Sequence, residues 1–151
     1  MCEHCGCQAL QTVQELTREH EVVLGHLREL SLALTAGDDV RPLCLELLRV
    51  LAPHTAGEEE ALLPAMAAEH PEHVAVLRAE HDLVHRALQE AAVAGPVPRL
   101  AHALQVLREH IAKEQDGLFP AALISLSAEQ WERAEQVRRR VRSALVAAGA
   151  R

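Results

Sequence analysis

The chain has 151 residues, of which 49% are hydrophobic and 25% charged, and this composition suits one globular domain with a single sizeable core. The formal net charge of −7 argues against nucleic-acid binding, which needs a basic surface. Aromatic residues make up only 1% of the chain, so Leu, Val and Ala must build the core, which favours packed helices.

Apolar residues recur at helical spacing in four long segments, which are separated by Gly- and Pro-containing breaks. The predicted helices span residues 8–36, 40–69, 71–94 and 98–125. Their short connections predict an all-α, up-down-up-down four-helix bundle. A fifth helix is expected from about Ser127 to Ala148, with a capped start and with Trp131 anchoring it to the outside of the bundle. We therefore divide the chain into a Cys-rich segment (1–8), the bundle (9–125) and a C-terminal helix (126–151).

Two local features modify this outline. Three prolines lie inside the second and fourth segments and should kink them, namely Pro53, Pro64 and Pro120. A basic cluster in the fifth segment is interpreted as a solvated helix face, and it comprises Arg138, Arg139, Arg140 and Arg142.

No apolar run approaches the ~18–20 residues of a membrane span. The first residues also lack the apolar stretch of a signal peptide. We therefore expect a cytoplasmic protein that does not bind membranes and whose cysteines are mostly reduced.

The most specific feature is an internal repeat. Residues 54–65 and 110–121 both follow the pattern H-x3-E-x3-L-[LF]-P-A. Residues i and i+4 lie on one face of a helix, about 6 Å apart along its axis. Each copy should therefore present an imidazole and a carboxylate side by side.

A fainter echo joins Glu19-His20-Glu21 in the first helix to Glu80-His81-Asp82 in the third, which also carries His85. The resulting set of candidate metal ligands is His20, His54, Glu58, His81, His85, His110 and Glu114. Seven ligands exceed the needs of one ion but suit two ions that share bridging carboxylates. Imidazole with carboxylate favours iron over calcium or magnesium. The remaining histidines lack the pattern, and His73 and His102 are expected at the surface.

Together, His20, H54-x3-E58, H81-x3-H85 and H110-x3-E114 resemble the hemerythrin, or HHE cation-binding, domain of bacterial type. The resemblance covers about residues 10–125. It implies a non-haem centre of two iron ions, bridged by two carboxylates and an oxide or hydroxide. Five histidines would complete the coordination and leave one site for dioxygen or a related small ligand.

The chain departs from the oxygen-carrying members of that family, which place an aspartate five residues after the last histidine. Here that position is Gln115, and the carboxylate is Glu114 at i+4, because Asp116 at i+6 should point away. This variant is similar to members linked to sensing, iron handling, and nitric oxide or peroxide chemistry. A ferritin-like di-iron bundle fits less well, since it uses E-x-x-H motifs and more carboxylates.

The N-terminal cysteines are a second candidate site. Cys2, Cys5 and Cys7 form C-x2-C-x-C, which is not a complete zinc signature. They would hold zinc or another soft metal if His4 or Cys44 supplied a fourth ligand. A redox relay to the irons and a tail of reduced thiols are the alternatives. Cys44 by itself is expected to be a small buried core residue.

Three functions remain open from the sequence. The first is a binding protein or sensor for dioxygen, nitric oxide or peroxide, in sensing or stress response. The second is a di-iron enzyme that acts on peroxide or nitric oxide. The third is an iron-handling or iron-supply protein whose metal is cargo. Catalytic residues are not assigned, because no general acid is evident beside the ligands.

Overall fold

A computed structural model describes residues 6–149, and every regular element in this range is helical. In chain order the elements are α1 (Cys7–Ala36), α2 (Arg41–Gly57), η1 (Glu58–Leu62), α3 (Leu63–Met66), α4 (Pro71–Ala94), α5 (Leu100–Lys113), η2 (Glu114–Leu118), α6 (Phe119–Ser125) and α7 (Ala128–Gly149). The elements η1 and η2 are single π-helical turns that join the helices on either side of them.

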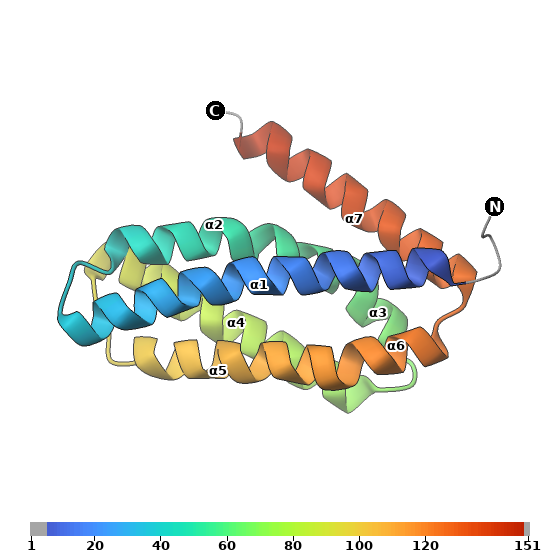
Figure 1. Ribbon diagram of the computed structural model, residues 1–151, viewed down its shortest axis with the longest axis horizontal. Helices are drawn as coiled ribbons and strands as arrows, with labels where there is room; N and C mark the ends of the chain where they lie inside the picture. Colours follow the sequence, from blue (N-terminus) through green and yellow to red (C-terminus); the bar gives the residue numbers. More distant parts are fainter. Residues whose placement is uncertain (1–5, 150–151) are drawn as a thin grey trace.

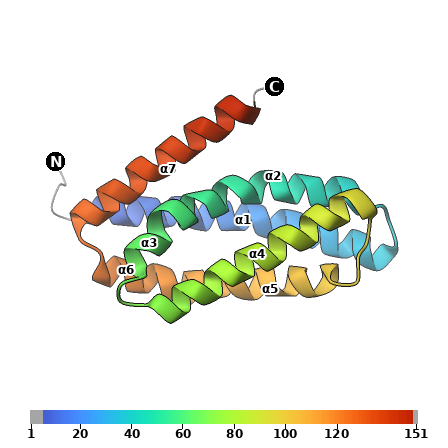
Figure 2. The ribbon, with the colours of Figure 1, turned by 180° about the vertical axis from the view of Figure 1, so that it is seen from behind.

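The long helices α1, α2, α4 and α5 lie side by side and form the bundle, as Figures 1 and 2 show from opposite sides. Short loops connect α1 to α2 and α4 to α5 at one end, so consecutive helices run antiparallel. The predicted all-α four-helix bundle is thereby confirmed. None of the described helices contains a stretch long and apolar enough to cross a bilayer.

The prolines of the repeat act by widening a helical turn. Pro64 has no N–H to donate to the carbonyl four residues earlier, so the chain adopts a π-helical turn just before it. In that turn the Leu63 N–H bonds to the Glu58 carbonyl, five residues back. The second copy repeats this bond between Phe119 and Glu114. The helix α2, by contrast, runs on through Pro53.

The buried interior consists of two apolar clusters with a polar layer between them. The chain crosses from one cluster to the other at candidate ligands in α1, in α4 and in the continuous segments α2–η1 and α5–η2. In α1, for example, Leu16 belongs to one cluster and Val23 to the other, and His20 lies between them. Cys44 is fully buried in the larger cluster, as its sequence context predicts. Apolar packing on both sides of the polar layer therefore fixes the level at which the ligands meet.

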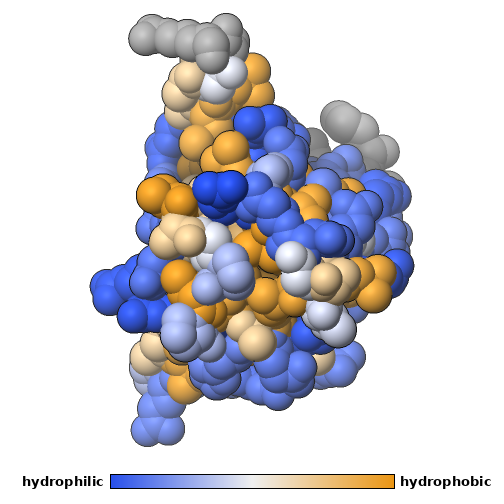
Figure 3. All heavy atoms as spheres, turned by 90° about the vertical axis from the view of Figure 1, so that its left-hand side faces the viewer, coloured by the Kyte–Doolittle hydropathy of each residue, from blue (hydrophilic) through white to orange (hydrophobic). Residues whose placement is uncertain are grey.

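The C-terminal helix α7 begins with the predicted cap. The Gln130 N–H donates to Ser127 Oγ, and the Ser127 N–H donates to Gln130 Oε1, which together make a capping box. Trp131 is 2% exposed and packs into the smaller apolar cluster, so the predicted anchor is confirmed. Farther along, α7 diverges from the bundle (Figure 1). The C-terminal end of α7 projects from the bundle in the view of Figure 3. Leu145 and Val146, in the last turns of α7, are 37% and 66% exposed.

The interpretation of the basic cluster as a solvated face is wrong at one position. Arg139, Arg140 and Arg142 are exposed, but Arg138 is only 4% exposed. Arg138 lies on the side of α7 that packs against the bundle, where carboxylates of α1 surround its guanidinium. The sequence could not distinguish it from its neighbours, since all four residues are arginines on one short helical stretch.

Candidate metal centre

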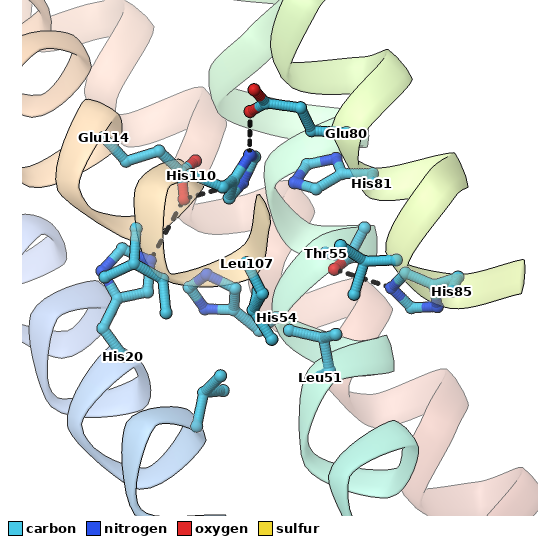
Figure 4. Close-up of a pocket in the computed structure, with 13 residues that line it drawn as sticks. His20, Leu51, His54, Thr55, Glu80, His81, His85, Leu107, His110 and Glu114 are labelled. Carbon is cyan, nitrogen blue, oxygen red and sulfur yellow. Dashed lines mark hydrogen bonds and ion pairs between the residues drawn. The ribbon is translucent and has the colours of Figure 1, made fainter. Parts of the chain in front are cut away.

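Six of the seven predicted ligands meet between the bundle helices. The imidazoles of His20, His54, His81 and His110 point into the same space (Figure 4). The carboxylates of Glu58 and Glu114 join them, and neither carboxylate is exposed. No member of this set is more than 7% exposed. The prediction that H-x3-E places both groups on one helix face is confirmed, because His54 Nε2 lies 3.0 Å from Glu58 Oε1 and His110 Nε2 lies 3.1 Å from Glu114 Oε1.

The six residues form two overlapping groups of ligand atoms, and within each group all atoms lie within 4.8 Å of one another. One group contains the His20 and His54 imidazoles, and we call it the first position. The other contains the His81 and His110 imidazoles, and we call it the second position. Glu58 and Glu114 belong to both groups.

Glu58 spans the two positions with its two oxygens. Its Oε1 lies 3.0 Å from His54 Nε2, and its Oε2 lies 3.3 Å from His81 Nε2. Glu114 also faces both positions, because its Oε1 lies 3.1 Å from His110 Nε2 and 3.2 Å from His20 Nε2. Both carboxylates are thus placed to be shared between the two positions.

Every imidazole of the cluster forms a hydrogen bond through its Nδ1 atom, the ring nitrogen that faces away from the centre. His54 Nδ1 donates to Glu19 at 2.6 Å, and His81 Nδ1 donates to Glu59 at 2.6 Å. His110 Nδ1 donates to Glu80 at 2.9 Å. His20 Nδ1 donates to the amide oxygen of Gln115, also at 2.9 Å. Such partners fix the tautomer, so each Nε2 turns its lone pair toward the centre.

These contacts repeat the internal duplication of the sequence. Glu19 and Glu80 each precede a cluster histidine, and each holds the imidazole of the H-x3-E motif that follows it in the chain. Glu59 and Gln115 each follow a cluster glutamate, and each holds a histidine of the other half. These roles were not predicted from the sequence, although the paired Glu-His dipeptides were a usable signal. Adjacent residues on a helix differ by about 100° in direction, which turns these side chains toward neighbouring helices.

The donor set fits a bound cation. Both oxygens of Glu58, the Nε2 atoms of His54 and His81, and Glu114 Oε2 are buried without a hydrogen-bond partner within residues 6–149. With Nδ1 carrying the proton, each Nε2 presents a lone pair to a carboxylate oxygen about as near as a hydrogen-bonding partner would be. Buried lone pairs that face one another are costly. A cation between them removes that cost, and imidazole with carboxylate suits transition metals.

Without metal, protons take the place of cations. Burial disfavours a charged imidazole at His54, but a proton on Nε2 can be donated to Glu58. The charge of Glu58 and the hydrogen bonds to Glu19 and Glu58 then outweigh burial and raise the pKa of His54 to about 10. The pKa values of His81 and His110 are also raised, since burial is again outweighed by hydrogen bonds and charge from Glu58 or Glu114. The charged imidazoles hold the pKa of Glu58 well below its usual range despite burial.

His85, the seventh predicted ligand, lies beside the cluster but is not part of either group. Its Nε2 atom is 3.1 Å from Thr55 Oγ1, and Figure 4 shows the ring turned toward that hydroxyl. Burial and the nearby charge of His81 lower the pKa of His85. The lowered pKa favours the neutral imidazole, and His85 lies on α4, the helix that also carries His81 of the second position. Its assignment as a ligand stays a prediction.

Two hollows meet at the Thr55–His85 pair. The inner one is a narrow pocket lined by the cluster and by apolar side chains, including Leu51 and Leu107. The outer one is a groove between α2 and α4, whose charged lining includes Arg86. Thr55, His81 and His85 line both.

The other candidate residues lie elsewhere. Cys2 and Cys5 fall outside the described residues, and Cys7 is an exposed residue at the start of α1. The second metal or redox site at the cysteines therefore stays a prediction. His73 and His102 are exposed, as expected, and so is Asp116.

A comparison with protein-family models identifies the hemerythrin HHE cation-binding domain over residues 11–122. No curated protein and no solved structure gives a significant match. The matched range contains all seven predicted ligands and both copies of the repeat, and it ends before α7. The buried His/Glu cluster and the family match agree on a metal-binding domain, and the chain belongs to the hemerythrin HHE cation-binding family.

Proposed function

We propose that the chain is a non-haem di-iron protein that binds dioxygen, or a related small ligand such as nitric oxide or peroxide, in sensing or stress response. The observation that carries the proposal is the sharing of two buried carboxylates by two histidine pairs. One ion would leave half of these donors without a partner, whereas two ions use all of them. The balance of imidazole over carboxylate favours iron.

The surroundings of the cluster support binding of a small ligand. Leu51 and Leu107 close the inner pocket with apolar walls, which limit access to small molecules and discourage polar side reactions. The groove between α2 and α4 shares Thr55, His81 and His85 with the inner pocket, so a ligand from solvent would enter past these residues. Glu19, Glu59 and Glu80 each accept a hydrogen bond from a cluster histidine. Glu58 and Glu114 are themselves candidate ligands, so the described part of the chain keeps no further buried acid in the cluster.

Metal analysis combined with optical spectra tests the proposal. We expect about two irons per chain, as for a two-metal site, and spectra of the reduced protein that change reversibly on exposure to dioxygen or nitric oxide. Zinc alone, or a single metal per chain, would refute a di-iron centre. Catalytic turnover of peroxide or nitric oxide that disappears in a His54→Ala variant would indicate an enzyme instead of a binding protein. Iron that exchanges within one mixing event would indicate iron supply instead.

A further inference from the structure

Arg138 of α7 is a buried charge whose position calls for an explanation. Its Nη2 atom lies 3.1 Å from Glu19 Oε1 and 3.7 Å from Glu15 Oε2, and its Nε lies 3.7 Å from Glu135 Oε2. A guanidinium that is only 4% exposed is costly unless carboxylates compensate it. The contact with Glu19 is the shortest of the three and the only one with hydrogen-bond geometry among those described.

Glu19 connects this arginine to the metal centre. One oxygen, Oε1, accepts the hydrogen bond from Arg138, and the other, Oε2, accepts the 2.6 Å hydrogen bond from His54 Nδ1. The carboxylate is therefore held at both ends. Its orientation determines where the His54 ring can lie, because a planar carboxylate accepts along defined directions.

The second position has a matching arrangement of a different origin. Lys113 donates to Glu80 Oε1, and Glu80 Oε2 accepts from His110 Nδ1 at 2.9 Å. Here the positively charged side chain, Lys113, lies on α5, next to the ligand Glu114 in sequence. At the first position the positively charged side chain, Arg138, comes from α7, outside the range that matches the family model.

We propose that Arg138 is a positioning residue, which holds Glu19 and through it the His54 imidazole, so that α7 sets how firmly the first position retains its metal. The proposal rests on the metal-binding function given above and adds a role for the C-terminal helix. It predicts that the two positions can be weakened separately, the first through Arg138 and the second through Lys113.

The test measures the release of ferrous iron from the loaded full-length protein to an excess of a coloured chelator. Replacing a direct partner of a metal-bound histidine typically weakens metal binding 10–100-fold. Arg138 acts one contact farther away, so we expect Arg138→Met to speed one of two release phases by roughly tenfold, the lower end of that range. Lys113→Met should speed the other phase. Arg139→Met is the matched control, since Arg139 is exposed and its ion pair, with Glu135 at 3.4 Å, does not involve Glu19.

Two further variants separate positioning from general loosening. Glu19→Gln should speed the same phase of iron release. Adding Arg138→Met to Glu19→Gln should change the release rate little more, because the two residues act in series. Arg138→Lys should give an intermediate rate, and it also takes the place of Arg138→Met if the latter does not fold. Equal acceleration of both phases, or an additive double variant, would overturn the proposal.

A measurement on the metal-free protein keeps this proposal distinct from the proposed function. The His54 Nδ1 proton, observed by NMR with 15N-labelled histidine, should shift in Arg138→Met and not in Arg139→Met. An unchanged signal would overturn the positioning role even if the protein binds two irons. Failure of the wild-type protein to bind iron would instead refute the proposed function, whatever the NMR result.

Discussion

Glu58 offers the sharpest test of a shared centre, because each of its oxygens faces a histidine of a different position. The change Glu58→Gln keeps the size of the side chain but removes its charge. Breaking a buried charge interaction of this kind costs roughly 3–5 kcal/mol. Since 1.4 kcal/mol corresponds to a factor of ten in affinity, we expect iron binding to weaken by a factor of about 10² to 4 × 10³.

The loss should affect both metals, and this is the distinctive expectation. Anaerobic titration with ferrous iron, followed by metal analysis after gel filtration, measures affinity and stoichiometry together. The matched control is Glu60→Gln, two residues along the same chain segment, whose carboxylate is 55% exposed and faces only Arg140 at 3.8 Å among the described residues. A Glu58→Gln protein that retains one iron with unchanged affinity would refute the shared-carboxylate reasoning.

The protonation of His54 and the anchoring of α7 give three further predictions. Iron binding should release protons at pH 7 and weaken as the pH falls, because the raised pKa of His54, about 10, keeps that imidazole protonated in the metal-free protein. Calorimetry in buffers of different ionisation enthalpy measures the number of protons released. The absence of proton release would contradict the prediction. In the metal-free protein the same raised pKa stabilises the fold fully below about pH 6.5, the pKa of an imidazole in the unfolded chain. This contribution to the free energy of unfolding is lost as the pH rises through about 10. A midpoint of urea unfolding that does not fall between pH 7 and 10 would count against the pairing of His54 with Glu58. Trp131→Ala should destabilise the protein by about 3–5 kcal/mol through the cavity it leaves, and Ser127→Ala by about 1 kcal/mol through loss of the helix cap; denaturant unfolding of both variants tests the ranking, which equal effects would contradict.

Much of the fold and of the ligand set followed from the sequence because both depend on local periodicity. The spacing of apolar residues fixes which side of a helix is buried, and the i, i+4 relation places His54 beside Glu58 whatever the rest of the fold does. The repeated Leu-x-Pro context located the two widened turns, although the expected form was a kink.

Other features depended on how separate helices are rotated and spaced, which no local pattern encodes. The pairing of Glu19 with His54 joins α1 to α2, and the burial of Arg138 joins α7 to α1. His85 has the same H-x3-H spacing that predicts a ligand, yet its Nε2 meets Thr55 of the neighbouring helix. The sequence by itself therefore determined the helices and the metal-binding face of each one. Only the tertiary structure decided which side chains support that face from behind, because those contacts form across helices whose relative positions are set by packing of the whole core.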